Sequence, residues 1–226
     1  IVGKLGEGRM CVVYRAHDTE LEREVAIKFL PDKIASNATE RERFNREAKA
    51  AAALNHPNIA TIYTIEEHDD EMFIVMEYVD GQELGDIVGA TDRSPLSTET
   101  IINYAIQIAE GLHAAHEKGI IHRDIKSSNI MITADGRVKI MDFGLAKRAR
   151  HGDMQLTKTG TTLGTVPYMS PEQLRGETID FRSDFWAFGV VLYETVTGNL
   201  PFTGEYEQAL MYAILNESPQ PVAELR

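Results

Sequence analysis

The stretch His122-Arg123-Asp124-Ile125-Lys126-Ser127-Ser128-Asn129 combines a carboxylate, a lysine and a carboxamide within a few positions. It follows a short apolar run, Gly119-Ile120-Ile121. The carboxylate of Asp124 suits the orientation of a hydroxyl group, the ammonium of Lys126 suits charge neutralisation, and the carboxamide of Asn129 suits metal coordination. A solvated turn rarely needs all three groups, so we interpret this stretch as a catalytic loop.

A second acidic position lies downstream, at the end of a strand expected over residues 137–141. Asp142 stands there within Met141-Asp142-Phe143-Gly144, next to a glycine that permits an unusual backbone turn. Together with Asn129 it offers the oxygen ligands that magnesium prefers. The two positions are therefore expected to hold metal.

Lys28 ends the apolar strand sequence Val25-Ala26-Ile27-Lys28. A lysine among buried neighbours needs an anionic partner. Glu47, nineteen residues later on a predicted helix, is a candidate for that partner, and the ammonium would then also be placed to hold phosphates. A surface lysine on an edge strand explains this tetrapeptide equally well when it is taken alone.

A glycine-rich segment, Gly6-Glu7-Gly8-Arg9-Met10-Cys11-Val12-Val13, lies between two predicted strands. Glycines in such a hairpin let backbone N–H groups approach phosphates without interference from Cβ atoms. The segment does not open a helix, so it is neither a dinucleotide-binding fingerprint nor a P-loop. An ordinary turn remains the alternative.

The predicted elements are mostly strands at first and helices afterwards. Strands are expected over residues 1–5, 12–16, 25–30, 59–65 and 72–78, where apolar and β-branched residues gather. A helix over 39–54 interrupts them, and helices over 101–115, 179–197 and 205–215 follow. This order indicates an α+β protein with a strand-rich lobe, a helical lobe and a cleft between them.

These motifs, in this order and spacing, resemble the signature set of protein kinases. The chain is similar to the eukaryotic-like serine/threonine protein kinases over residues 1–216, and residues 46–59 look particularly like bacterial members. The resemblance implies a bilobal fold with an N-lobe over residues 1–76, a hinge over 77–80 and a truncated C-lobe over 81–226. It also implies ATP and Mg²⁺ as cofactors, with Mn²⁺ as a substitute.

Catalytic roles follow from the same resemblance. Asp124 would accept or orient the proton of a substrate hydroxyl, and Lys126 would neutralise charge on the transferring γ-phosphoryl group. Asn129 and Asp142 would hold two magnesium ions. The implied reaction is transfer of the γ-phosphoryl group of Mg-ATP to protein serine or threonine hydroxyls.

Nucleotide contacts are implied in the same way. Lys28, locked by Glu47, would grip the α- and β-phosphates. Met76 would be the gatekeeper, and the backbone of Glu77 and Val79 would bond the edge of the base. The other expected ATP contacts come from the glycine-rich segment and the two faces of the adenine site: Leu5, Gly6, Glu7, Gly8, Val13, Ala26 and Met131.

The family's serine/threonine members carry a lysine and a threonine at the positions of Lys126 and Thr165, which favours serine or threonine acceptors over tyrosine. Residues 142–172 resemble an activation segment and contain four candidate phosphorylation sites, Thr157, Thr159, Thr161 and Thr162. We hypothesise that Arg43, Arg123 and Lys147 form a pocket for a phosphothreonine. Unrelated surface charges are the alternative. Autophosphorylation is expected in trans, through a transient homodimer.

Charge and composition limit the classes of molecule that this chain is expected to bind. Lys and Arg total 23 and Asp and Glu total 35, a formal net charge of −12 that repels nucleic-acid phosphates and anionic lipid. Cys11 is the only cysteine, so no intrachain disulfide is possible, and no apolar run approaches the roughly 20 residues that cross a bilayer. We therefore expect protein substrates, and a cytoplasmic kinase fragment or the cytoplasmic domain of a larger membrane-anchored kinase.

Two alternatives share parts of this pattern. A pseudokinase or ATP-binding scaffold with the same fold would fit the truncation and Cys11, which replaces the third glycine of the loop. Such proteins usually lose a residue of the type of Lys28, Asp124 or Asp142, and all three are present here. A small-molecule kinase of the aminoglycoside or choline type shares a His-x-Asp and a later asparagine. Such enzymes usually lack Lys126 and the threonine-rich segment.

Three histidines, His113, His116 and His122, lie close together in the sequence. They lack the glutamate and the spacing of a zinc-protease helix. By the family match, His122 would lie in the core beneath Phe143. All three are expected to be structural.

Overall fold

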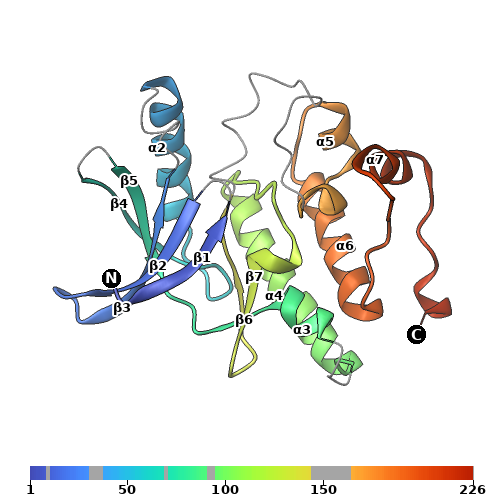
Figure 1. Ribbon diagram of the computed structural model, residues 1–226, viewed down its shortest axis with the longest axis horizontal. Coiled ribbons are helices and arrows are strands. Elements are labelled where there is room, and N and C mark those ends of the chain that lie inside the picture. Colours follow the sequence, from blue (N-terminus) through green and yellow to red (C-terminus); the bar gives the residue numbers. More distant parts are fainter. Residues whose placement is uncertain (9–10, 31–37, 69–70, 91–94, 144–163, 226) are drawn as a thin grey trace.

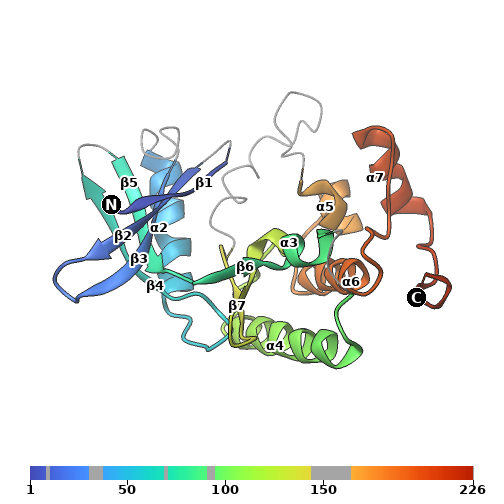
Figure 2. The ribbon, with the colours of Figure 1, turned by 60° about the horizontal axis from the view of Figure 1, so that its bottom comes forward.

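The computed structural model describes residues 1–8, 11–30, 38–68, 71–90, 95–143 and 164–225. Strands dominate the N-terminal part and helices the C-terminal part, and the two chain ends lie at opposite sides of the molecule (Figures 1 and 2). This is the α+β, two-lobed arrangement predicted from the order of elements.

A five-stranded antiparallel sheet forms the N-lobe. Its strands are β1 (Gly3–Gly8), β2 (Cys11–Asp18), β3 (Arg23–Phe29), β4 (Ile62–His68) and β5 (Glu71–Glu77), in the order β1-β2-β3-β5-β4. Helix α2 (Ala38–Ala52) packs beside this sheet (Figure 1). In β5 every second residue is buried, because successive side chains of a strand point to opposite faces.

Strand register places the residues expected at the nucleotide site on one face of this sheet. Ala26 and Lys28 are two residues apart on β3, so they share a face. Ala26 pairs with Met76 of β5, and Lys28 pairs with Val13 of β2. The four residues therefore form one block of neighbouring positions.

The C-lobe combines a small sheet with helices. The sheet contains β6 (Gly81–Glu83), β7 (Ile130–Thr133) and β8 (Val138–Ile140). The α-helices are α3 (Leu84–Gly89), α4 (Thr98–Glu117), α5 (Pro171–Arg175), α6 (Arg182–Thr197) and α7 (Glu207–Asn216). Three 3-10 turns, η1 (Ser127–Asn129), η3 (Val166–Tyr168) and η4 (Val222–Glu224), complete the described elements. No described helix is long and apolar enough to cross a membrane.

One hydrophobic core runs through both lobes. It joins side chains of the N-lobe sheet and α2, such as Ile74 and Ala48, to side chains of α4, β8 and α6, such as Leu112, Ile140 and Val191. All five of these residues are fully buried. The two lobes are therefore packed against each other by apolar contact as well as joined by the chain.

The segment before β4 corrects one prediction. A strand was expected over residues 59–65, but β4 begins at Ile62. Ile59 instead pairs with Ile140 of β8, and the N–H of Ala60 donates to the carbonyl of Ile140 at 3.0 Å. The N–H of Ile140 in turn donates to the carbonyl of Asn58 at 2.8 Å. The backbone of residues 58–60 is therefore hydrogen-bonded to β8 of the C-lobe, and these residues do not extend β4.

The start of α6 is a second correction. A helix was expected from residue 179, but it begins at Arg182. The carboxylate of Asp180 accepts a hydrogen bond from the N–H of Arg182 at 2.9 Å, a side-chain bond that competes with helical backbone pairing. The short elements β6, β7, α3 and α5 were not predicted, because they span too few residues to show a period.

Candidate active site

The backbone of the catalytic loop, residues 122–129, is hydrogen-bonded to a carboxylate of α6. Asp184 is only 1% exposed, and its oxygens accept hydrogen bonds from the backbone N–H groups of His122 and Arg123, each at 2.7 Å. His116 Nε2 also lies 2.7 Å from this carboxylate. Arg123 has a φ of 67°, an unfavourable value for a non-glycine residue that these hydrogen bonds help to stabilise. The backbone direction just before Asp124 is set in this way.

The three polar side chains of the loop meet around Asp124. Lys126 Nζ lies 3.6 Å from Asp124 Oδ2 and donates to Thr165 Oγ1 at 3.4 Å. Asn129 Nδ2 donates to the backbone carbonyl of Asp124 at 2.8 Å and to its Oδ2 at 3.3 Å. The structure therefore brings together Asp124, Lys126, Asn129 and Thr165. Since the amide nitrogen of Asn129 is engaged, its carbonyl oxygen is the atom suited to a metal ion.

Asp142 follows β8 and faces the N-lobe. Its Oδ1 lies 2.6 Å from the Nζ of the buried Lys28, so this ion pair joins the two lobes. Burial raises the pKa of Asp142, but the charge and hydrogen bond of Lys28, with a smaller contribution from Lys126, together hold the pKa below its usual range. The anionic partner seen for Lys28 is thus Asp142. Its pairing with Glu47, which lies on α2, stays a prediction.

Residues on both sides of Asp142 are anchored. The N–H of Met141 donates to the carbonyl of Asn129 at 2.8 Å, which brings the two expected metal ligands, Asn129 and Asp142, to neighbouring chain segments. Phe143 is buried and packs on the ring of His122, with centroids 4.6 Å apart, as predicted. His122 Nε2 lies 2.8 Å from the carbonyl oxygen of Met141. Among the described residues, no group of three or more His, Cys, Asp or Glu is arranged to hold a metal ion.

The expected nucleotide contacts lie on strands of both lobes. Leu5, Gly6, Glu7 and Gly8 belong to β1, Val13 to β2, Ala26 and Lys28 to β3, Met76 and Glu77 to β5, and Met131 to β7. Val79 follows β5 and is buried. Strand pairing makes Val13 a neighbour of Lys28 and Ala26 a neighbour of Met76, and the full set of nucleotide contacts stays a prediction.

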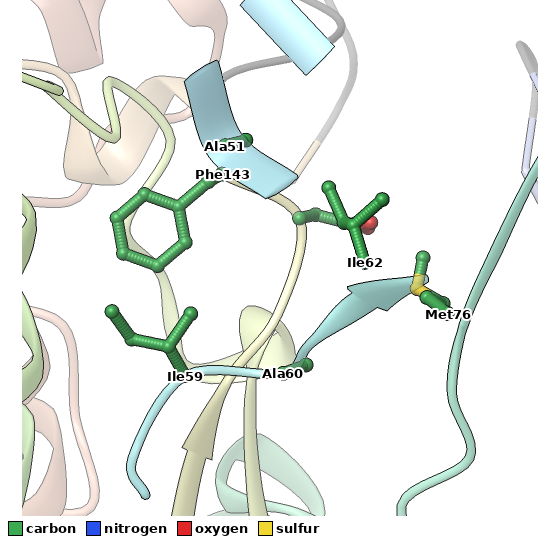
Figure 3. A pocket seen from close by; sticks show the side chains of 7 residues that line it. Ala51, Ile59, Ala60, Ile62, Met76 and Phe143 are labelled. Carbon is green, nitrogen blue, oxygen red and sulfur yellow. The ribbon is translucent and has the colours of Figure 1, made fainter. Parts of the chain in front are cut away.

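A small cavity of about 10 Å³ lies behind Met76. Figure 3 shows Met76 and Phe143 on opposite sides of it. Its lining comes from α2, the segment before β4, β4, β5 and the residues that follow β8, namely Ala51, Ile59, Ala60, Ile62, Met76, Asp142 and Phe143. The volume suits about one water molecule, so the space behind Met76 is nearly filled by protein.

Two charged residues that sequence reasoning missed support the site. Asp184 is one of them, and Lys139 is the other. Lys139 Nζ lies 2.7 Å from Glu77 Oε1, and Glu77 Oε2 accepts from the N–H of Thr61 at 3.1 Å. The available signal was a charge inside an apolar strand or helix, because a buried charge needs a partner.

The candidate phosphorylation sites Thr157, Thr159, Thr161 and Thr162, and Lys147 of the proposed pocket, lie outside the described residues. Arg43 lies on α2 and Arg123 in the catalytic loop. The pocket for a phosphothreonine stays a prediction.

Comparison with known proteins gives a consistent result. A model described as the protein kinase domain matches residues 1–224. The chain is 43% identical to the probable serine/threonine-protein kinase SCO3848 of Streptomyces coelicolor, over 96% of the chain and 32% of that protein. It is 42% identical to the serine/threonine-protein kinase PknB of Mycobacterium tuberculosis, over 96% of the chain and 35% of that protein. The chain therefore spans about a third of the length of these curated relatives.

A solved structure shares the fold. Residues 1–466 of Rad53, in complex with AMP-PNP, superimpose with a TM-score of 0.76 at 29% sequence identity. The match covers 95% of this chain and 52% of that one. The likeness extends over both lobes.

Proposed function

The chain belongs to the protein kinase domain family and is a domain of its serine/threonine type, and from this premise we propose that it transfers the γ-phosphoryl group of ATP to serine and threonine hydroxyls of proteins. One observation carries the proposal. The Lys28–Asp142 ion pair of 2.6 Å and the Asp124–Lys126–Asn129 cluster lie on segments that the Met141–Asn129 backbone hydrogen bond holds together. Phosphoryl transfer needs this combination of cations, metal-binding oxygens and a hydroxyl-orienting carboxylate.

Asp124 orients the acceptor hydroxyl and receives its proton in this proposal. A general base must reach that proton within hydrogen-bond distance. Lys126 contacts both Asp124 and Thr165, which supports a role for its ammonium in neutralising charge on the transferring group. Little covalent chemistry is asked of the protein, so most of the acceleration comes from positioning and electrostatics.

The residues present fit ATP and magnesium. Asp142 and the side-chain carbonyl oxygen of Asn129 would supply oxygen ligands for Mg²⁺, with Mn²⁺ as a substitute. Lys28 would supply a cation for the phosphates. The bound Rad53 relative carries an ATP analogue, which supports the same use here. ATP bound to this chain would contact the glycine-rich segment through its phosphates and the remaining residues through its adenine: Leu5, Gly6, Glu7, Gly8, Val13, Ala26, Met76, Glu77, Val79 and Met131.

Regulation is proposed to act through phosphorylation of the segment before Thr165. Two copies would meet transiently and phosphorylate each other on Thr157, Thr159, Thr161 or Thr162. The phosphate would then pair with Arg43, Arg123 and Lys147, since Arg and Lys form strong charge-assisted hydrogen bonds with phosphate oxygens. Equal activity of a Thr157→Ala/Thr159→Ala double variant would argue against this scheme.

The setting is proposed to be the cytoplasm, as the catalytic domain of a longer kinase acting on protein substrates. The relatives are about three times as long as this chain, which supports the idea of further domains. The acidic net charge of −12 disfavours nucleic acid as a partner.

Intact-mass spectrometry after incubation with ATP and Mg²⁺ tests the proposal. We expect phosphoryl groups on the wild type and on an Asp135→Asn control, because Asp135 is an exposed turn residue between β7 and β8. An Asp142→Asn variant should gain none, because it loses a metal ligand. Myelin basic protein serves as the acceptor in parallel. Absence of transfer by the wild type to itself and to this acceptor would reject the proposed function.

A further inference from the structure

The peptide group that links Arg123 to Asp124 is held from both sides by side chains. Its carbonyl oxygen accepts a hydrogen bond from Gln173 Nε2 at 3.0 Å. Its N–H, which belongs to Asp124, donates to His122 Nδ1 at 3.2 Å. Gln173 lies on α5, fifty residues further along the chain than Arg123, so one of these restraints comes from outside the catalytic loop. Together the two contacts fix the plane of the last peptide group before the side chain of Asp124.

The carboxamide of Gln173 has only one orientation that satisfies both of its neighbours. The N–H of Ser170 donates to Gln173 Oε1 at 2.9 Å, and a backbone N–H can only donate. The carbonyl of Arg123 can only accept, so the NH₂ group of Gln173 must face it. Ser170 Oγ in turn accepts from the N–H of Gln173, which completes a capping box at the start of α5. The side chain of Gln173 therefore has two separable tasks, since its oxygen closes the cap and its nitrogen holds the catalytic loop.

Helix α5 is itself fixed to α6, beside the residue that holds the catalytic loop. Ser183 Oγ of α6 donates to Glu172 Oε1 at 2.5 Å, and Leu174 is buried in an apolar cluster of the C-lobe. The residue after Ser183 is Asp184, which accepts the backbone N–H groups at the start of the catalytic loop. The Gln173 contact therefore closes a ring of three elements: α6, α5 and the catalytic loop.

Arg123 is a strained residue, so the catalytic loop depends on support at this point. Its φ of 67° persists only where the surroundings determine the backbone conformation. Asp184 restrains the N–H of Arg123, and Gln173 restrains its carbonyl group. Rotation of that carbonyl group turns the following N–H and moves the carboxylate of Asp124, which must come within hydrogen-bond distance of an acceptor hydroxyl.

We propose that Gln173 is a positioning residue for phosphoryl transfer: its carboxamide holds the carbonyl of Arg123 and thereby sets the direction of the Asp124 carboxylate. The inference rests on the proposed function and deepens it. A catalytic group needs to be held within about 0.5 Å and 10–20° of its productive geometry. Loss of the Gln173 donor should therefore slow the transfer step. The residues proposed to bind ATP lie on other elements than α5, so the affinity for ATP should change little.

Gln173→Glu separates the two tasks of this side chain. A glutamate keeps an acceptor for the N–H of Ser170, and Ser-x-x-Glu is a common capping-box sequence, so the cap remains. The other oxygen of an ionised glutamate cannot donate, and it would face the carbonyl oxygen of Arg123. Gln173→Ala removes both contacts. Ser170→Ala is the matched control, because it removes the cap hydroxyl and leaves the carboxamide of Gln173 in place.

The kcat and the KM of ATP are measured for each variant with myelin basic protein as the acceptor. We expect kcat to fall about 2- to 10-fold in Gln173→Ala, the range for one lost hydrogen bond. It should fall about 10- to 100-fold in Gln173→Glu, because repulsion between the two oxygens displaces the peptide group before Asp124. The KM of ATP should stay within about twofold in both variants, since the lost contact acts on the transfer step.

Melting temperatures should follow a different order from kcat. Gln173→Glu should melt at or above Gln173→Ala, because it keeps the cap and adds a negative charge to the first turn of a helix. Ser170→Ala should melt about 2–4 °C below the wild type, the shift that accompanies loss of one helix cap in a chain of this size. Its kcat should stay within about twofold of the wild type.

A kcat within about twofold of the wild type in both Gln173 variants would overturn the inference. So would kcat losses that follow the melting temperatures, with Ser170→Ala as slow as Gln173→Ala, because they would reflect the stability of α5 alone. A rise in the KM of ATP as large as the fall in kcat would assign the effect to the nucleotide site and also contradict it. Absence of transfer by the wild type would instead reject the proposed function, and this inference with it.

Discussion

The ion pair between Lys139 and Glu77 offers a quantitative test of how the two lobes are joined. Lys139 lies on β8 and Glu77 at the end of β5, with their charged atoms 2.7 Å apart. The side chains are 11% and 23% exposed, respectively. Lys139→Met keeps most of the apolar stem and removes the charge, so it leaves the Glu77 carboxylate in place without its ammonium partner.

Removing one partner of a fully buried ion pair costs about 3–5 kcal/mol. The cost should be lower here, since Glu77 keeps a hydrogen bond from the N–H of Thr61 and part of its carboxylate is open to water. We expect a loss of about 2 kcal/mol for Lys139→Met. For a chain of this size, about 2–4 °C accompanies each kcal/mol, so the melting temperature should fall by about 4–8 °C.

Thermal and urea unfolding, followed by circular dichroism at neutral pH, measures this loss. Arg41→Met is the control, because its pair with Glu67 is about as short, at 2.6 Å, but roughly 40% exposed on both sides. It should cost less than about 1 kcal/mol. A Lys139→Met/Glu77→Gln double variant buries neither charge, so its loss should fall short of the summed single losses by at least about 1 kcal/mol. Losses that add within about 0.5 kcal/mol would refute the reasoning.

Three other predictions follow from the site and the fold. Gly81→Ala would place a Cβ 2.5 Å from the carbonyl oxygen of Ile132 and should destabilise the fold by about 1–3 kcal/mol. Gly189 is exposed in α6, and a Cβ added there would meet no atom of another element within 4 Å, so Gly189→Ala should stabilise the fold by about 0.5–1 kcal/mol. Melting temperatures in the reverse order would contradict this. Burial raises the pKa of Glu194 above its unfolded value, so the folded state holds the proton more tightly. The stability that this proton gives the wild type is full below the unfolded pKa and is lost as pH rises through the folded pKa. Urea unfolding of Glu194→Gln and the wild type at a series of pH values should therefore show the difference shifting toward the variant from about pH 4 to pH 7, and a constant difference would speak against it. Removal of divalent metal by EDTA should abolish phosphoryl transfer, measured by incorporation of labelled phosphate, and added Mg²⁺ or Mn²⁺ should restore it; transfer that persists in EDTA would exclude the metal site.

Much of the site was predictable because its reactive groups are close neighbours in the sequence. Asp124, Lys126 and Asn129 lie within one loop, and such a short loop can hardly avoid bringing them together. Asp142 was recognisable from the strand before it and the glycine after it. The contact between His122 and Phe143 was expected from the family match and is present.

Other features depend on pairings that no local pattern reveals. The carboxylate observed beside Lys28 is Asp142, a partner that the sequence did not suggest, while the expected pairing of Lys28 with Glu47 stays a prediction. Ile59 pairs with Ile140 of the other lobe, although its neighbours read as part of an N-lobe strand. Several partners for Ile59 were compatible with the sequence, and long-range packing selects among them.

Sequence alone was sufficient for the α+β class, the two-lobed order of elements and the choice of candidate site residues, because periodicity and short motifs are local properties of the chain. Tertiary structure was needed to show that Asp184 carries the catalytic loop and that Ser127 meets Tyr168. A buried charge or hydroxyl is stable only beside a partner, and these partners come from elements far apart in the sequence. Only the folded chain shows which of the possible partners lies within hydrogen-bond distance.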